Sequence, residues 1–535
     1  MFGDFPVRRV FMVAAALSVT CVAWAGTMNP WLWGGFIIVG PLVVLGIIDM
    51  AQKKQTIRRN FPLLGHGRYL MEMVRPGVNQ YFVESNTDGR PFNRVVRSNI
   101  YQRAKQALNT VPFGTQYDVY EEGYEWINHS MNPIEASREE PKELIGGSEC
   151  RQPYLASHFN ISAMSYGALS DRAVLALNKG ARLGGFAHNT GEGGLSPYHL
   201  EHGGDIIWQL GTGYFGARDD AGNFSPERFA EKACLPSVKM IELKLSQGAK
   251  PGHGGILPAE KLTPEIAQIR HVSMGQDVLS PPGHGAFQDP IGMMHFIATL
   301  RELSGGKPVG FKLCVGQKHE FFAVCKAMLE TGILPDYIAV DGGEGGTGAA
   351  PLEFSNSVGT PLNEGLVFVH NALVGCNLRD QIRVFAGGKI TTGFSMAAKL
   401  AMGADFCYSA RGFMFALGCI QALECNSNTC PTGITTHNRD LVQGLVVEDK
   451  ANRVANYHRN TIHSFMELLG AAGLTHPSQL QPWHILRRTS FNEVKNLGQI
   501  FHYLHPGELL GDDLPPLYKA PWVRARASSY EPSHA

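Results

Sequence analysis

The chain has 535 residues, of which 44% are hydrophobic and 61 are glycine, enough for a large soluble core with many tight turns. Lysine plus arginine and aspartate plus glutamate number 47 each, so no net charge marks the chain as a nucleic-acid binder. Most of the ten cysteines are scattered through apolar runs, which excludes a disulfide scaffold and indicates a reduced, cytosol-facing protein.

Residues 1–59 predict a membrane anchor. The segments 10–28 and 31–50 carry no charge before Asp49, and each is long enough to cross the hydrocarbon core of a bilayer. Only an Asn-Pro pair separates them, so two spanning helices would form a hairpin. Basic residues precede the first segment and follow the second, which places both ends on the cytoplasmic side. We therefore expect a protein of the cytoplasmic membrane whose catalytic domain is cytoplasmic.

A signal peptide is the alternative for the N-terminus. The Ala-Trp-Ala at 23–25 resembles a cleavage site after a short apolar run, and cleavage there would leave 31–50 as the anchor. Basic residues follow Met50 closely and oppose export of what comes next, which favours the hairpin.

Two regions flank the main domain and carry weaker patterns. Residues 60–150 are mixed and polar and predict a cap or linker region. Within them, residues 67–82 predict an amphipathic helix broken at Pro76. Residues 476–535 predict a short, proline-rich C-terminal tail.

Residues 151–475 predict an α/β domain of the (β/α)8 TIM-barrel class. Short apolar runs that end in glycine-rich turns recur eight times, and helical patterns follow later ones at 290–303, 318–331 and 393–403. Near-continuous apolarity is expected of parallel strands buried on both faces. An open dinucleotide-binding sheet is disfavoured because no G-x-G-x-x-G follows an early strand. The expected strands are 159–164, 184–190, 206–212, 238–245, 308–315, 336–343, 382–388 and 405–412.

The ends of these strands predict a phosphorylated cofactor. Function in such a barrel lies at the carboxyl ends of its strands, and a phosphate commonly binds there on backbone N–H groups after the seventh and eighth. Here the turns 387–393 and 409–412 supply those groups. Lys312 lies inside an apolar run, where an ammonium is costly unless it is paired or used. Beside a flavin it would stabilise the anionic reduced ring; a snorkelling structural lysine is the alternative.

Three cysteines follow the last strand closely, with the spacing C-x5-C-x4-C. A zinc site would need a fourth ligand, and His437 is oddly spaced for that role. A catalytic thiol would need only one cysteine with a paired base. Iron–sulfur ligation suits three thiolates, and Pro431 directly after the third cysteine is typical of cluster-binding runs. Inert thiols that cluster by chance are the remaining possibility.

Seven motifs occur in one order along residues 155–440: MSYGALS, NTGEGG, QGAKPGHGG, SPPGH, DGGEGGTGAAPL, GGKITTG and GCIQALECNSNTCPTGITT. In sequence and order they closely resemble the FMN-binding synthase domain of glutamate synthases. The cluster motif of that family has the same three-cysteine spacing, which makes the resemblance specific. It covers more than half of the chain.

The resemblance implies cofactors and a site. It implies a [3Fe–4S] cluster on Cys419, Cys425 and Cys430, next to an FMN in the barrel mouth. Lys250 and Arg270 match family residues that hold the carboxylates of 2-oxoglutarate, and Glu192 matches an acidic residue near the imine-forming site. By matching position, the FMN contacts would be Ala163, Met164, Ser165, Gln247, Lys312, Gly387, Gly388, Ser409 and Ala410.

The residues themselves support the same chemistry. Lys250 and Arg270 could clamp a dicarboxylate, reduced flavin could reduce a carbon–nitrogen double bond, and Glu192 could transfer protons during imine formation. The reaction would be reductive amination of 2-oxoglutarate, or a related 2-oxo acid, to L-glutamate.

The sequence differs from the family pattern in ways that make us expect other molecules to supply the ammonia and the electrons. The chain has no room for a glutaminase domain, and His253 stands where the family usually places glutamate. Ammonia would be free or come from another protein, and electrons from a ferredoxin, an NAD(P)H-oxidising subunit or a membrane donor. Two alternatives remain: a flavin oxidoreductase that acts on another substrate and is coupled to membrane electron carriers, or a non-catalytic anchored subunit.

Overall fold

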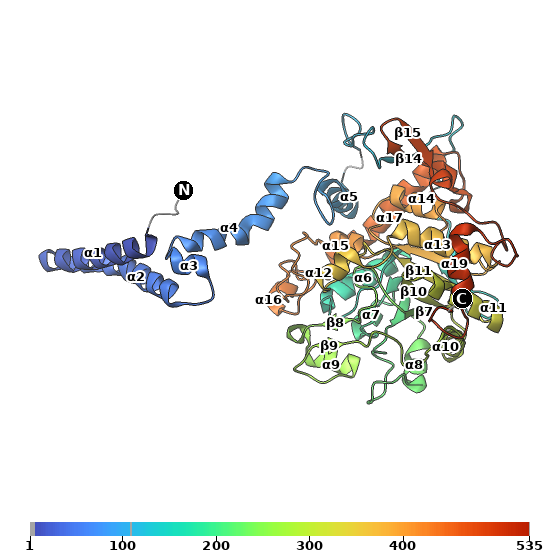
Figure 1. Cartoon of the computed structure of the whole chain (residues 1–535), viewed down its shortest axis with the longest axis horizontal. Coiled ribbons are helices and arrows are strands. Elements are labelled where there is room, and N and C mark those ends of the chain that lie inside the picture. Colours follow the sequence, from blue (N-terminus) through green and yellow to red (C-terminus); the bar gives the residue numbers. More distant parts are fainter. Residues whose placement is uncertain (1–5, 108–109, 138, 534–535) are drawn as a thin grey trace. The chain divides into compact units, whose positions relative to one another are not determined.

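The structure is a computed structural model that describes residues 6–107, 110–137 and 139–533. The chain divides into two compact units, Met1–Arg94 and Val95–Ala535 (Figure 1). The finer division predicted from the sequence, with boundaries near residues 59, 150 and 475, stays a prediction.

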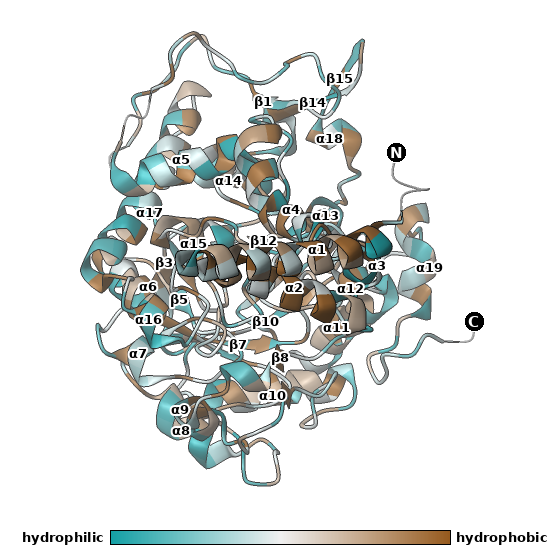
Figure 2. Ribbon diagram, turned by 90° about the vertical axis from the view of Figure 1, so that its left-hand side faces the viewer, coloured by the Kyte–Doolittle hydropathy of each residue, from teal (hydrophilic) through white to brown (hydrophobic). Residues whose placement is uncertain are grey.

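The N-terminal unit contains two long apolar helical segments where the sequence predicts them. They are α1 (Val7–Met28) and the continuous segment formed by η1 (Pro30–Gly35) and α2 (Phe36–Ala51). Both are long and apolar enough to cross a membrane, and only 6% of each is buried within the molecule. In Figure 2 most of the α2 ribbon has the brown colour of hydrophobic residues. Glycine allows the hairpin to pack tightly, because a Cβ on Gly26 would collide with the Trp33 ring.

A short helix and an amphipathic helix follow, α3 (Thr56–Asn60) and α4 (Gly65–Val78), and η2 (Asn79–Val83) continues α4. The predicted break at Pro76 is wrong, because the helix passes through this residue. A proline in the last turn of a helix removes only one hydrogen bond, and Asn79 N still donates to the carbonyl oxygens of Arg75 and Pro76.

The second unit is built on a closed barrel of eight parallel strands, which confirms the predicted fold class (Figure 1). Each strand lies within or largely within one of the eight predicted runs. In barrel order from the first they are β4 (Phe159–Ile161), β5 (His188–Asn189), β6 (Ile206–Leu210), β7 (Val238–Lys244), β10 (Val309–Cys314), β11 (Tyr337–Asp341), β12 (Arg383–Gly387) and β13 (Phe406–Ser409). Closure pairs Cys407 of β13 with Phe159 of β4.

Helices surround the barrel, and three of them match the predicted helical patterns: α10 (Pro290–Leu303), α11 (Lys318–Thr331) and α14 (Gly393–Ala401). Polar caps fix several starts; Asp289, for example, accepts a hydrogen bond from Gly292 N at the start of α10. The others are α5 (Arg94–Lys105), α6 (Asp171–Gly184), α7 (Pro197–Leu200), α8 (Pro226–Ala233), α12 (Leu352–Ser357), α13 (Leu362–Gly375), α15 (Arg411–Leu417), α16 (Arg439–Val442) and α17 (Val447–Ala471).

Between the fourth and fifth barrel strands the chain makes an excursion that matters for the site. It consists of the hairpin β8 (Ile256–Leu257) and β9 (Val278–Leu279), with η3 (Ala259–Lys261) and α9 (Pro264–Arg270) between its strands. Thr263 caps α9 by accepting a hydrogen bond from Ile266 N, and His271 ends it in the left-handed region.

The C-terminal tail has more structure than the sequence predicts. Strand β14 (Ile485–Ser490) pairs with β15 (Glu493–Asn496) and also with β1 (Glu125–Ile127), far earlier in the chain. The other elements of the tail are η4 (Pro477–Gln479), η5 (Pro482–His484), α18 (Leu497–Ile500) and α19 (Pro516–Arg524). A further antiparallel pair, β2 (Glu143–Ile145) with β3 (Tyr154–Ala156), precedes the barrel.

Large apolar side chains fill the barrel away from its mouth. The ring of Phe385 stacks on that of Phe406 at a centroid distance of 4.7 Å and on that of Tyr408 at 4.5 Å. All three side chains are at most 1% exposed. This packing closes the barrel as a solid core, so ligands can reach only its ends.

Candidate functional site

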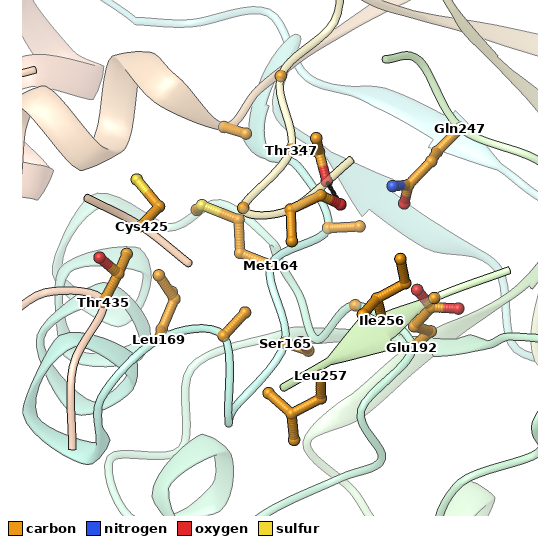
Figure 3. Close-up of a pocket in the computed structure, with 18 of the residues that line it drawn as sticks. Met164, Ser165, Leu169, Glu192, Gln247, Ile256, Leu257, Thr347, Cys425 and Thr435 are labelled. Atoms are coloured by element: carbon orange, nitrogen blue, oxygen red, sulfur yellow. Dashed lines mark hydrogen bonds between the residues drawn. The ribbon is translucent and has the colours of Figure 1, made fainter. Parts of the chain in front are cut away.

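A cavity of about 130 Å³ lies at the carboxyl ends of the barrel strands. Its walls come from the turns after β4, β5, β7, β11 and β13, from the excursion between β7 and β10, and from the segment that contains Cys425. Figure 3 shows Cys425 and Thr435 on one side of the cavity and Glu192 and Gln247 on the other, with Met164 between them. The cavity therefore joins the predicted substrate residues to the cysteine segment.

Glu192 lies among cations at the substrate side. Its Oε1 pairs with Lys244 Nζ at 2.7 Å, and its carboxylate fits between Gly211 and Gly255, where a Cβ would approach it to 2.6 and 2.5 Å. Burial acts to raise the pKa of Glu192, but Lys244, and after it Lys250 and Arg270, outweigh burial and lower it. The group is therefore a carboxylate at neutral pH.

The two predicted carboxylate-binding cations line the same cavity, and each is 4% exposed. Lys250 Nζ donates to Ala349 O at 2.9 Å, and burial lowers its pKa to about 8 against the opposing charge of Glu192. Arg270 Nη2 donates to Tyr166 O at 3.1 Å, and burial lowers its pKa to about 10. Arg270 Nε has no hydrogen-bond partner among the described residues.

The residues predicted to contact FMN divide into two groups. Five of them line the cavity: Ala163, Met164, Ser165, Gln247 and Ala410. The other four do not line it: Lys312 lies within β10, Gly387 and Ser409 end β12 and β13, and Gly388 follows β12.

Lys312 is a paired, buried lysine, so it does not snorkel to solvent. Its side chain is 4% exposed, and Nζ lies 3.1 Å from Asp341 Oδ2. Burial acts to lower the pKa of Lys312, but Asp341 and Glu242 outweigh burial and raise it. Glu242 in turn accepts hydrogen bonds from three residues, Asn189 (2.8 Å), Gln209 (2.7 Å) and Tyr408 (3.0 Å). A fixed positive charge thus stands beneath the mouth of the barrel.

Two glycine-rich turns, residues 246–255 and 342–351, meet across the mouth. Ala249 N donates to Gly343 O at 3.1 Å, and Gly248 and Gly342 approach so closely that any side chain on Gly248 would collide with the Gly342 carbonyl. Glycine at position 248 makes this approach possible. The cavity that these turns help to line is, at about 130 Å³, smaller than the roughly 300–1,000 Å³ usual for ligand pockets.

The three cysteines lie on an irregular loop, residues 418–430, after α15. Gln421, Leu423 and Asn428 all have left-handed backbone angles, with φ near 60°, which costs energy outside glycine. Gln421 N donates to Cys419 Sγ at 3.4 Å, and Arg411 Nη1 donates to Cys425 Sγ at 3.5 Å. N–H donors and a guanidinium next to the sulfurs suit thiolate ligands.

The zinc alternative fits this loop poorly. His437, the candidate for a fourth ligand, forms a hydrogen bond between its Nε2 and Gly167 O at 2.9 Å. Among the residues that the structure describes, no three His, Cys, Asp or Glu side chains converge on a position for one metal ion.

Three cations of the site were missed by the sequence analysis: Lys244, Lys261 and Arg411. Lys244 ends an apolar run just as Lys312 lies within one, and the same cost of burial could have identified it. Lys261 stands in a mixed segment that is indistinguishable from surface sequence. Arg411 lies in the turn 409–412, which the sequence predicts to bind phosphate through backbone groups and not through this side chain. Only the fold brings them to the cavity.

Residues 93–475 match the family model described as the conserved region in glutamate synthase. The chain is 37% identical over 512 residues to the glutamate synthase large subunit-like protein YerD of Bacillus subtilis, covering 87% of this chain and 97% of that protein. It is 36% identical over 315 residues to the archaeal glutamate synthase [NADPH] of Methanocaldococcus jannaschii, covering 59% of this chain and 58% of that one. The chain thus spans about three fifths of the length of that archaeal relative.

Among solved structures, the chain is similar to a flavocytochrome b2 mutant, with a TM-score of 0.41 and 12% identity over 79% of this chain and 85% of that one. A likeness this distant does not bear on function.

Proposed function

The chain belongs to the glutamate synthase family, and from that premise we propose that it is a flavin and iron–sulfur enzyme that aminates 2-oxoglutarate, or a related 2-oxo acid, reductively to L-glutamate. Members of this family are oxidoreductases that act on CH–NH₂ donors. The observation that supports the proposal most is the cavity itself. It joins a carboxylate held among three cations to the segment that contains Cys425.

The residues at the barrel mouth fit FMN in kind. Lys312 supplies a fixed charge, and Gly387, Gly388 and Ser409 supply backbone groups where barrels bind phosphate. At Gly348, which lines the cavity, a Cβ would meet nothing within 4 Å, so there is open space beside the backbone. FMN would supply hydride transfer. Because the cavity is small, binding would require the turns 246–255 and 342–351 to separate.

The cysteine loop likewise fits a [3Fe–4S] cluster on Cys419, Cys425 and Cys430. The cluster would supply the flavin with single electrons. A ferredoxin, an NAD(P)H-oxidising subunit or a membrane donor would deliver them, and ammonia would be free or come from another protein.

Lys250 and Arg270 would hold the two carboxylates of the oxo acid. Their fixed charges lie in a cavity largely closed to water, where charge-assisted hydrogen bonds are strong. The free N–H of Arg270 Nε is one donor available for this contact. Lys244 would keep Glu192 ionised and in place.

Glu192 would transfer the protons of imine formation. Condensation of ammonia with the oxo group releases water, so two protons must pass in turn from the nitrogen to the departing oxygen. A carboxylate between Lys244, Lys250 and Arg270 can accept each proton from the nitrogen and deliver it to the oxygen. The imine carbon then receives a hydride, and its nitrogen receives a proton.

The decisive experiment is anaerobic. The purified full chain is assayed for FMN, iron and sulfide, reduced chemically, and mixed with 2-oxoglutarate and ammonium. Reoxidation of the flavin with one glutamate formed per FMN is the expected result. A flavin that stays reduced while the cluster is intact would rule out this substrate pair and favour the alternative of a flavin oxidoreductase with another substrate.

The two long apolar helices support membrane attachment of this enzyme, with its catalytic unit in the cytoplasm. Carbonate extraction of membranes tests it: an anchored chain stays in the pellet, whereas a peripheral one is released. Release of the full-length chain would remove the support for a membrane electron donor.

A further inference from the structure

A buried lysine lies beside the cysteine loop, and the proposed reaction gives it no role. Lys261 ends η3 and is 2% exposed. Its ammonium donates three hydrogen bonds to backbone carbonyl oxygens, those of Ala168 (2.8 Å), Cys425 (3.2 Å) and Thr435 (2.9 Å). One side chain thus ties the turn after β4 to the cysteine loop and to the segment that follows it.

Within the part of the chain that the structure describes, no carboxylate forms an ion pair with this ammonium. The described residues offer Lys261 no ion-pair partner, and its hydrogen-bond acceptors are neutral. Burial lowers the pKa of Lys261 to about 8, and the negative charges of the Cys425 and Cys430 thiolates oppose that shift. A buried ammonium without a counter-charge is costly, and carbonyl oxygens offset only part of that cost. The structure therefore places an unbalanced positive charge next to two of the three cysteines.

We propose that Lys261 is the buried counter-charge of the iron–sulfur cluster and raises its reduction potential. The inference rests on the proposed function, which assigns the cluster to Cys419, Cys425 and Cys430. Three thiolates and four sulfides outweigh the charge of three ferric ions, so the oxidised cluster is negative. Reduction adds one electron from the donor protein and deepens that charge. A nearby fixed cation stabilises the reduced form more than the oxidised one.

Arg411 also contacts Cys425, but its position indicates a different role. Its guanidinium bridges Cys425 Sγ and Thr347 O, and thus joins the cysteine loop to the turn 342–351. The residue is half-buried, whereas Lys261 is fully buried. Solvent screens a buried charge less, so Lys261 is expected to have the larger effect on the potential.

The test compares Lys261→Met with Lys261→Arg in the full-length protein. Methionine keeps the length of the side chain and removes the charge, whereas arginine keeps the charge and the N–H donors. Potentiometric titration, followed by the electron paramagnetic resonance signal of the cluster, gives the potential without any turnover. We expect Lys261→Met to lower the equilibrium constant for cluster reduction at least tenfold, a negative shift of about 59 mV. Lys261→Arg should stay close to the wild type.

The outcomes separate this inference from the proposed function. A wild-type protein without iron and sulfide would refute the cluster assignment itself. An intact cluster whose potential is unchanged in Lys261→Met would overturn the counter-charge role alone. If methionine prevents cluster assembly, Lys261→Gln keeps two N–H donors without the charge. Loss of the cluster in both neutral variants, but not in Lys261→Arg, supports the counter-charge role. Loss in all three variants would overturn it, because assembly would then depend on the shape of the lysine side chain and not on its charge.

Discussion

At the scale of single residues, the substrate side of the cavity is a balance of one carboxylate against three cations. Glu192 pairs with Lys244, and Lys250 and Arg270 add to the positive charge around it. A bound dicarboxylate would bring two more negative charges to this place. Removal of a cation or of the carboxylate therefore changes the net charge around the bound substrate. The effect on substrate binding differs from the effect on the rate of the reaction.

Removal of a clamping cation should weaken substrate binding. We expect Lys250→Met to raise the KM for 2-oxoglutarate about 10- to 100-fold, the value of one charge-assisted hydrogen bond. Steady-state kinetics measure it, and FMN and iron content should stay unchanged. Met in place of Lys519, an exposed lysine, is the matched control and should have no effect. An unchanged KM would exclude Lys250 from the clamp.

Removal of the carboxylate should have the opposite effect on binding. Glu192→Gln takes a negative charge away from the three cations, so we expect the Kd for 2-oxoglutarate to fall or stay constant. The kcat should fall about 100- to 10,000-fold, the usual contribution of a general acid–base group. Equilibrium binding and single-turnover reoxidation of the flavin separate the two effects. A variant with normal kcat would show that Glu192 transfers no proton.

At the scale of elements, α4 is an amphipathic helix with an uncovered apolar face. Leu70, Met71 and Met73 are 49%, 61% and 71% exposed, whereas Arg68 and Glu72 form an ion pair at 2.7 Å on the other side. The helix begins 14 residues after the end of the second long apolar segment. In a membrane-anchored protein, such a helix is expected to lie in the headgroup region of the bilayer.

Photo-crosslinking tests the position of α4. With benzoylphenylalanine at Leu70 or Met73, the full-length protein in vesicles of phosphatidylethanolamine and phosphatidylglycerol should crosslink to lipid. The same probe at Glu72, on the polar face of the same helix, should not. Equal crosslinking from both faces, or none from either, would contradict an interfacial helix.

Local patterns in the sequence predict the barrel strands because each run is apolar on both faces and ends in glycine, as buried parallel strands require. Helices α10 and α11 follow directly from periodicity and caps. The pairing of β1 with β14 could not be predicted in this way, because the strands are short and far apart in the chain. For the same reason the position of Lys261 could not be predicted, because its hydrogen-bond partners lie in three separate segments of the chain.

At the scale of the whole molecule, buried histidines determine how stability depends on pH. Burial lowers the pKa of His188 to about 3, that of His284, His370 and His458 to about 4, and that of His199 well below its usual value. The folded state thus holds these rings neutral. In the unfolded chain they take up protons below about pH 6.5. Their contribution to stability is complete above that pH and is lost as the pH falls toward 4.

Thermal unfolding between pH 7.5 and 5.0 measures this effect. Each ring with a folded pKa near 4 should cost on the order of 2 kcal/mol of stability at pH 5, so the Tm should fall steadily below pH 6.5. Glu242 and Glu320 act in the opposite direction, because burial raises the pKa of both, but they are fewer. A Tm that stays constant down to pH 5 would show that these rings are not neutral and buried in the folded protein.

The pairing of β1 with β14 also bears on how the chain is made. Glu125–Ile127 finds its partners at Ile485–Arg487, so this strand stays single until almost the whole sequence has left the ribosome. At typical rates of synthesis the delay is roughly 20–70 s. During that time the apolar N-terminal helices have already emerged. In the membrane-anchored protein proposed above, assembly of the barrel would then take place on a nascent chain tethered at the membrane, where neighbouring copies cannot diffuse together freely in three dimensions.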